Sequence, residues 1–315
     1  MINRFIILLL LLVNVNALAG PQSTVVTSIR PLGLIAQELL TGIDAANVVI
    51  LLPETASPHG FSLQPSDMQE LLTAPIVVWL GAEFEPYLAK AIQRVNAQHT
   101  QIVTVTALKG IRLLPGRDID ENTMGEEHAL GSHHDHHGHD MLTDDPHLWW
   151  SAHNGMLIAE QLAQQLIAEK PQFESQVQKN LTAMQSRLQQ AQREMVAQAK
   201  SLTGNFLIYH DSLRYLEQEV QLGSQRRVAV SQETKPSVKD MLSLLRWLQN
   251  NKVNCLILEP GASQQLVRRI NPKGIIAEVT IDPLGWDSAS YTAMWLGGAQ
   301  TLLDCASGKV PVTRK

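Results

Sequence analysis

The sequence predicts an α/β protein whose two halves each contain a parallel β-sheet, with a long helix between them. Three observations predict this fold class. Short apolar runs alternate with helical segments across residues 24–105, the same alternation returns across residues 205–303, and residues 171–200 have the pattern of one amphipathic helix. Strands that alternate with helices favour parallel sheets covered on both faces. The predicted architecture is therefore two Rossmann-like α/β domains joined by a helix.

Four apolar runs in the first half are predicted strands. They cover residues 24–29, 47–52, 76–80 and 101–105. A helix is predicted over residues 32–40. The run Ser66–Gln69 has the form of a capping box, which indicates that a short helix begins there.

The long helix is predicted over residues 171–200, and Pro171 suits an early helical position. Apolar residues recur in it at alternating steps of four and three, as on one face of an amphipathic helix. They are Val177, Leu181, Met184, Leu188, Ala191 and Met195. Such a face fits a helix packed across both halves of the chain. The alternative is a coiled-coil surface for a partner.

The second half repeats the alternation. Its predicted strands cover residues 205–209, 227–230, 255–258 and 275–279. Its predicted helices cover residues 212–221, 236–250 and 291–303. Gly223 is expected to close the first of these helices, because glycine is the usual residue just past a helix end.

The first residues have the form of a secretion signal. Arg4 precedes the apolar run Phe5–Val13, and Ala17–Ala19 supplies small residues for cleavage, so residues 1–19 are the predicted signal peptide. A membrane anchor is the alternative, but a span takes about 20 apolar residues. No cysteine follows the small residues, so a lipid anchor at this site is not expected. We expect a periplasmic protein whose mature chain begins near Gly20.

The mature chain divides into an N-terminal domain over residues 20–170, a linker helix over 171–200 and a C-terminal domain over 201–315. Residues 118–144 interrupt the first domain with a polar, histidine-rich stretch that is predicted to be a mobile loop. The formal net charge is -5 and the pI is near 6.1. This charge does not suggest a nucleic-acid partner.

The chain has two cysteines, Cys255 and Cys305. In an exported protein an isolated pair predicts a disulfide. The alternative is a pair of thiolate metal ligands, which their wide separation and the absence of a CxxC motif disfavour. A disulfide would tie the strand at Cys255 to the last helix.

Three histidines suggest a metal site. His59 and His210 each follow a predicted strand, one in each half, and His147 lies directly after the histidine-rich stretch. Ligands of open α/β sheets bind beyond the carboxyl ends of strands, so a cleft between the domains could gather these side chains. Imidazole is the commonest zinc donor, and zinc takes four ligands. Asp282 could be the fourth ligand or only a turn former, with water as the other candidate.

The histidine-rich loop could bind metal more weakly. It contains His128, His133, His134, His136, His137 and His139. Such density makes loose, interchangeable metal contacts plausible, although ordering a mobile loop costs entropy. A solvated spacer without a role is the alternative. His99 and His153 are not assigned to either site.

Several motifs, in this order and spacing, resemble a known family. They are Pro58–Asp67 (PHGFSLQPSD), the histidine-rich loop, Asp145–Trp149 (DPHLW), Tyr209–Asp211 (YHD) and the Cys255/Cys305 pair. Over essentially the whole mature chain, the sequence resembles the metal-binding receptors of bacterial ABC importers for zinc, manganese and iron. Its nearest likeness is to the periplasmic zinc receptors among them.

The resemblance implies two α/β domains joined by a rigid helix, with Zn²⁺ bound in the cleft by His59, His147 and His210. It also implies delivery of the metal to an inner-membrane permease coupled to an ATPase, by a protein expected to be monomeric. Some zinc-type members have an acidic residue where Pro58 stands, which leaves the fourth ligand open. Asp282 matches an aspartate ligand of manganese-type members.

Other functions remain as alternatives. A manganese or iron receptor is disfavoured because three imidazoles make a nitrogen-rich site, whereas manganese favours oxygen donors. A zinc hydrolase needs an open coordination position and a general base. No HExxH motif occurs, and no glutamate adjoins a predicted ligand. A metal-storage or adhesion protein working through the histidine-rich loop is the third alternative.

Overall fold

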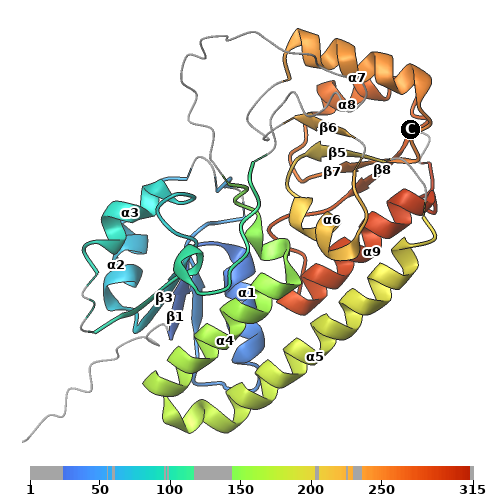
Figure 1. Cartoon of the computed structure of the whole chain (residues 1–315). Coiled ribbons are helices and arrows are strands. Elements are labelled where there is room, and N and C mark those ends of the chain that lie inside the picture. Colours follow the sequence, from blue (N-terminus) through green and yellow to red (C-terminus); the bar gives the residue numbers. More distant parts are fainter. Residues whose placement is uncertain are drawn as a thin grey trace, which may run out of the picture.

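Two parallel β-sheets, one in each half of the chain, form the framework of the molecule (Figure 1). The computed structural model describes residues 24–54, 56–58, 61–95, 97, 99–116, 144–202, 206–224, 226–229 and 236–312. The predicted signal peptide and the histidine-rich loop lie outside these residues, except that Asp144 at the end of the loop is described.

The N-terminal sheet has the strand order β2-β1-β3-β4, and all three of its strand pairs are parallel. The strands are β1 (Val25–Thr27), β2 (Val48–Ile50), β3 (Ile76–Trp79) and β4 (Gln101–Thr104). The helices of this half are α1 (Arg30–Leu39), α2 (Pro65–Thr73) and α3 (Pro86–Ile92), and the short 3-10 turn η1 (Val105–Ala107) follows β4.

Successive residues of these strands point to opposite faces of the sheet, as the pleat requires. Val25 and Val78 pack into the core shared with α1, whereas Val26 and Val77 pack into a smaller core with α2 and α3. Both faces are therefore covered, which explains why these strands are mainly apolar and show no regular alternation with polar residues. The polar exceptions are Thr27, Gln101 and Thr104.

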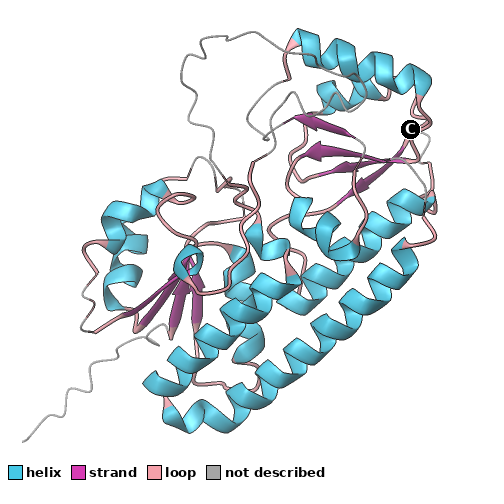
Figure 2. Ribbon diagram, viewed as in Figure 1, coloured by secondary structure: helices cyan, strands magenta, loops and turns pink. Residues whose placement is uncertain are grey.

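The C-terminal sheet repeats this plan with the order β6-β5-β7-β8, again all parallel. Its strands are β5 (Phe206–His210), β6 (Arg226–Ala229), β7 (Cys255–Leu258) and β8 (Ala277–Thr280). Its helices are α6 (Arg214–Val220), α7 (Val238–Asn250), α8 (Gln264–Ile270) and α9 (Tyr291–Ser307). Helices α7 and α8 cover one face of the sheet, and α6 and α9 cover the other (Figures 1 and 2).

Two long helices link the halves. A 3-10 turn η3 (Leu148–Trp150) leads into α4 (Ala152–Glu169), and a second turn η4 (Pro171–Phe173) leads into α5 (Glu174–Ala199). The six apolar positions predicted for the long helix are all buried. They pack against α1 of the first half and α6 and α9 of the second, so one continuous apolar core runs through both halves.

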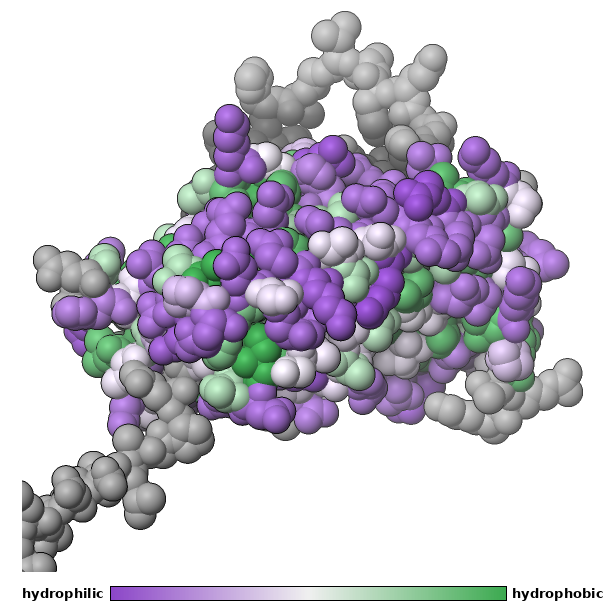
Figure 3. Space-filling model, turned by 90° about the horizontal axis from the view of Figure 1, so that it is seen from below, coloured by the Kyte–Doolittle hydropathy of each residue, from purple (hydrophilic) through white to green (hydrophobic). Residues whose placement is uncertain are grey.

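The structure therefore confirms a helix packed across both halves. The opposite side of α5 is polar, and the face seen from below in Figure 3 is mostly hydrophilic. No continuous apolar stripe for a coiled-coil partner is visible on this face in the described part of the chain.

The disulfide prediction is confirmed. Cys255 in β7 and Cys305 in α9 are joined, with their Cα atoms 5.2 Å apart and both residues fully buried. The bond closes a loop with a sequence separation of 50, which in the chain-entropy model contributes about 4 kcal/mol to stability.

Some local predictions were wrong. The capping box of α2 begins at Gln64, whose backbone N–H donates to Asp67 Oδ2 at 2.7 Å, and not at Ser66. Helix α6 ends at Val220 and is capped by Gln221, and not by Gly223; Gln221 adopts the left-handed conformation (φ 57°) that usually favours glycine. The predicted long helix is confirmed: Pro171 occupies an early position of the 3-10 helix η4, which runs directly into α5 at Glu174.

Helices α4 and α8 were not predicted at all. Five of the eight buried residues of α4 are alanine, glycine or asparagine, which carry little hydrophobic signal. In the part of the chain that the structure describes, no helix is long and apolar enough to span a membrane.

Adjacent glycines in α9 provide a test of the packing between the halves. A Cβ atom on Gly298 would lie 2.6 Å from the fully buried Trp150 ring, whereas one on Gly297 would meet nothing within 4 Å. We expect Gly298→Ala to lower the free energy of unfolding by about 1–3 kcal/mol through overpacking. Gly297→Ala should raise it by up to about 1 kcal/mol through helix propensity.

Urea unfolding of both variants measures this difference. Equal effects of the two substitutions would contradict the close packing of α9 on Trp150.

Candidate metal site

Two of the predicted ligands are presented by different parts of the chain. His210 is the last residue of the central strand β5, where the carboxyl end of a parallel sheet places ligand-binding groups. His147 directly precedes the turn η3. Both side chains are buried, with relative exposures of 3% for His210 and 5% for His147.

The structure brings these two histidines together. Their ring centroids lie 5.1 Å apart, and the ring planes are inclined by 74°. The rings therefore meet edge to face, in an arrangement in which one nitrogen of each ring could approach a common ion.

Each histidine is held by a buried carboxylate. His147 Nδ1 lies 2.8 Å from Asp145 Oδ1, and His210 Nδ1 lies 3.0 Å from Glu259 Oε1. Ser212 Oγ donates to the same Glu259 oxygen at 2.5 Å. A neutral imidazole that donates Nδ1–H to a carboxylate carries its lone pair on Nε2, the atom that would bind a metal. This carboxylate–histidine arrangement is the usual support for a metal-ligating histidine.

Sequence reasoning did not find these carboxylates. Asp145 precedes His147 by two residues, and this short separation could have indicated that the two side chains interact. Glu259 directly follows β7, so its place at the carboxyl end of a strand was a second signal. Its pairing with His210, 49 residues away, depends on β5 and β7 being neighbours in the sheet.

The charges of these groups stabilise one another. Burial by itself lowers the pKa of His210, but the hydrogen bond and charge of Glu259, with Asp211 and Asp145, raise it above its ordinary value overall. Burial raises the pKa of Glu259, yet the hydrogen bond and charge of His210 hold it below the usual range. Similarly, His147 holds the pKa of buried Asp145 below the usual range.

The remaining predicted site residues are placed differently. Asp282 accepts backbone hydrogen bonds from Leu284 at 2.9 Å and from Trp286 at 2.6 Å, as a turn-forming aspartate does. His59 lies outside the described residues, as do the six histidines of the loop. Within the described residues, no group of three histidine, cysteine, aspartate or glutamate side chains is arranged to hold a metal ion.

The two unassigned histidines lie apart from this pair. His99 is exposed, and His153 Nε2 lies 3.0 Å from the carbonyl oxygen of Gly110.

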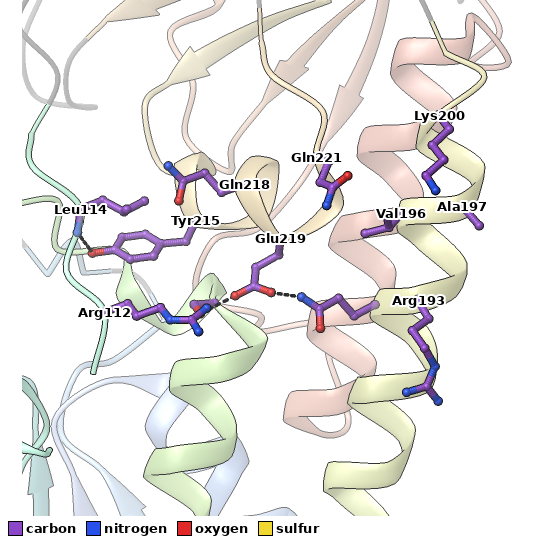
Figure 4. A pocket seen from close by; sticks show the side chains of 12 residues that line it. Arg112, Leu114, Arg193, Val196, Ala197, Lys200, Tyr215, Gln218, Glu219 and Gln221 are labelled. Atoms are coloured by element: carbon purple, nitrogen blue, oxygen red, sulfur yellow. Dashed lines mark hydrogen bonds between the residues drawn. The ribbon is translucent and has the colours of Figure 1, made fainter. Parts of the chain in front are cut away.

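A separate pocket of about 460 Å³ lies between α5 and α6 (Figure 4). Glu219 lines this pocket, and its carboxylate accepts hydrogen bonds from Ser151 Oγ at 2.5 Å and from Gln192. No histidine is among its lining residues. This pocket therefore contributes no histidine ligand to the candidate metal site.

Two parallel-sheet domains linked by long helices, with one buried histidine at the end of a strand and a second beside it, define a class of two-domain α/β proteins with a candidate metal site. Solved structures agree on the fold. A crystal structure of ZnuA covers 90% of this chain and 99% of its own, with a TM-score of 0.72 and 21% identity. The laminin-binding protein of Streptococcus agalactiae covers 90% of this chain and 98% of its own, with a TM-score of 0.70 and 16% identity.

The sequence comparison is more specific. The family model "Zinc-uptake complex component A periplasmic" matches residues 25–305. The high-affinity zinc uptake system protein ZnuA of Yersinia pestis is 32% identical over 284 residues, covering 88% of this chain and 87% of its own length. The protein of the same name from Haemophilus ducreyi is 29% identical over 284 residues, covering 89% and 90%. The chain belongs to this ZnuA family of zinc-uptake components.

The link between His210 and Glu259 can be tested without metal. Glu259→Gln should lower the pKa of His210, because the substitution removes the main charge that favours the protonated ring. Imidazole NMR titration of the metal-free protein measures this shift. Asp240→Asn is a matched control, since Asp240 caps α7 and belongs to the outer layer of the C-terminal sheet. An unchanged pKa in Glu259→Gln would contradict the role assigned to Glu259.

Proposed function

We propose that this chain captures Zn²⁺ in the periplasm and delivers it to the permease and ATPase of an ABC importer. The observation that carries this proposal is the buried pair His147–His210, each supported by a carboxylate, in a member of a zinc-uptake family. Relatives with this architecture are named as components of high-affinity zinc uptake systems. The chain is accordingly a binding protein and not an enzyme.

The proposed ligands are His59, His147 and His210. Three imidazoles form a nitrogen-rich site, which suits zinc better than manganese. Asp282 or a water molecule takes the fourth position. The two backbone hydrogen bonds of Asp282 occupy one lone pair on each carboxylate oxygen, so ligation would use a remaining lone pair.

The cell compartment and assembly belong to the same proposal. Residues 1–19 act as a cleaved signal peptide, and the mature protein works as a periplasmic monomer. The proposed domains are residues 20–170 and 201–315, with residues 171–200 as the linker. The presence of a buried disulfide is consistent with an oxidising compartment.

Substitution of the two proposed ligands that lie in the described part of the chain tests the site. His147→Ala and His210→Ala should each weaken zinc binding by more than about 100-fold. Loss of a ligand should exceed the 10–100-fold effect typical of losing a residue that only supports one. Competition with a chromophoric chelator measures the affinity, and His99→Ala is the matched control on the surface.

The same titration assigns the fourth ligand. Asp282→Asn should weaken binding if Asp282 is a ligand and leave the affinity near that of the wild type if water is. If His147→Ala and His210→Ala both retain wild-type affinity, the proposed site is wrong.

Deletion of residues 126–140 separates the cleft from the histidine-rich loop. A receptor with a cleft site should keep one tightly bound zinc ion per chain and lose only weak sites, because a loop must first be ordered to bind metal. Native mass spectrometry with metal analysis gives the count. Loss of nearly all binding would favour a storage protein acting through the loop.

A further inference from the structure

The residues on either side of the histidine-rich loop are paired with each other. Pro115 and Asp144 form an antiparallel bridge, and the backbone N–H of Asp145 donates to the carbonyl of Leu114 at 2.7 Å. We call these two segments, residues 114–115 and 144–145, the stem. The stem fixes the point at which the chain enters the segment that carries His147.

Helix α6 clamps the stem from the C-terminal half. The hydroxyl of Tyr215 accepts a hydrogen bond from the backbone N–H of Leu114 at 2.9 Å and donates one to the carbonyl of Asp145 at 3.0 Å. Arg214 donates a further hydrogen bond to the carbonyl of Pro115. Tyr215 is 2% exposed, and burial raises its pKa, so the hydroxyl keeps the proton that it donates.

Asp145 connects the stem to His147. Its Oδ1 accepts from the backbone N–H of His147 at 2.9 Å and lies 2.8 Å from His147 Nδ1. The position and orientation of the His147 ring therefore depend on the residue whose carbonyl Tyr215 holds.

The rest of this segment is also docked on the C-terminal half. Trp149 Nε1 donates to the carbonyl of Pro283 at 2.8 Å, and the Tyr291 hydroxyl donates to the carbonyl of Trp149 at 2.6 Å. His147 precedes the linking helices in sequence. Its position is nevertheless fixed by contacts with the half that carries His210.

We propose that Tyr215 is a positioning residue for metal capture, which clamps the stem and so holds His147 against His210 before the metal arrives. His147 belongs to the N-terminal domain in sequence but is held by the C-terminal half, so it forms a half-site with His210 there. His59 then completes the set of three proposed histidine ligands. This inference rests on the proposed function.

Tyr215→Phe tests the inference. It retains the ring but removes both hydrogen bonds, leaving the backbone N–H of Leu114 without this acceptor. In the full-length mature protein, the zinc dissociation constant should rise about tenfold, as for other residues that support a ligand. Tyr87→Phe is the matched control, because it removes a single hydroxyl contact, with Glu85, on α3 in the other half.

A double-mutant cycle distinguishes positioning from general destabilisation. In a His147→Ala background, Tyr215→Phe should cause no further loss of zinc affinity, because the ligand that it positions is gone. An equal loss in both backgrounds would overturn the inference, as would wild-type affinity in Tyr215→Phe alone. A wild-type protein that fails to bind zinc tightly would refute the proposed function itself.

Discussion

The contact between the turn η3 and helix α9 is the interaction on which the arrangement of the two halves depends. Trp149, Trp150, Tyr291 and Trp295 are the largest fully buried side chains of the described chain. Aromatic side chains bury about 150–250 Å² each, so these four make the largest individual contributions to the core that both halves share. Trp295 Nε1 and the Tyr291 hydroxyl donate to the backbone carbonyls of Trp150 and Trp149, which restricts how the two elements can be rotated against each other.

The positions of His147 and His210 depend on this packing. His147 directly precedes the turn, and His210 ends the strand beneath α6, so the packing that fixes the turn also fixes the distance between the rings. A buried imidazole or carboxylate is costly to ionise alone. Here Asp145 and Glu259 place negative charge beside the two rings, which favours binding of a cation by the pair. A divalent metal ion would therefore bind where the surrounding charges already favour it.

The sequence predicted the parts of the fold that repeat. Strands buried on both faces are short apolar runs, and the buried face of α5 has a clear helical period, so both were predicted from residue order alone. Helix α4 was missed because small residues such as Ala152 and Gly155 pack closely without a strong hydrophobic signal. Gly155 has a packing reason that no local pattern shows, since a Cβ there would lie 2.1 Å from the Tyr291 hydroxyl oxygen.

In the candidate site, too, residues that follow a local or topological rule were predicted, and residues that depend on tertiary contacts were not. His210 was predicted because it lies at the carboxyl end of a strand, which is a rule of topology. Glu259 and Tyr215 could not be predicted, because their roles depend on contacts between β5 and β7 and between α6 and the stem. His59 and the loop histidines remain predictions from sequence.

The most direct test of the central claim is zinc K-edge X-ray absorption of the protein loaded with one Zn²⁺ ion per chain. We predict a first shell of four nitrogen or oxygen atoms near 2.0–2.1 Å, with the outer-shell scattering of three imidazole rings. His147→Ala and His210→Ala should each remove one ring from that signal. A shell of oxygen donors with no imidazole scattering would contradict the account.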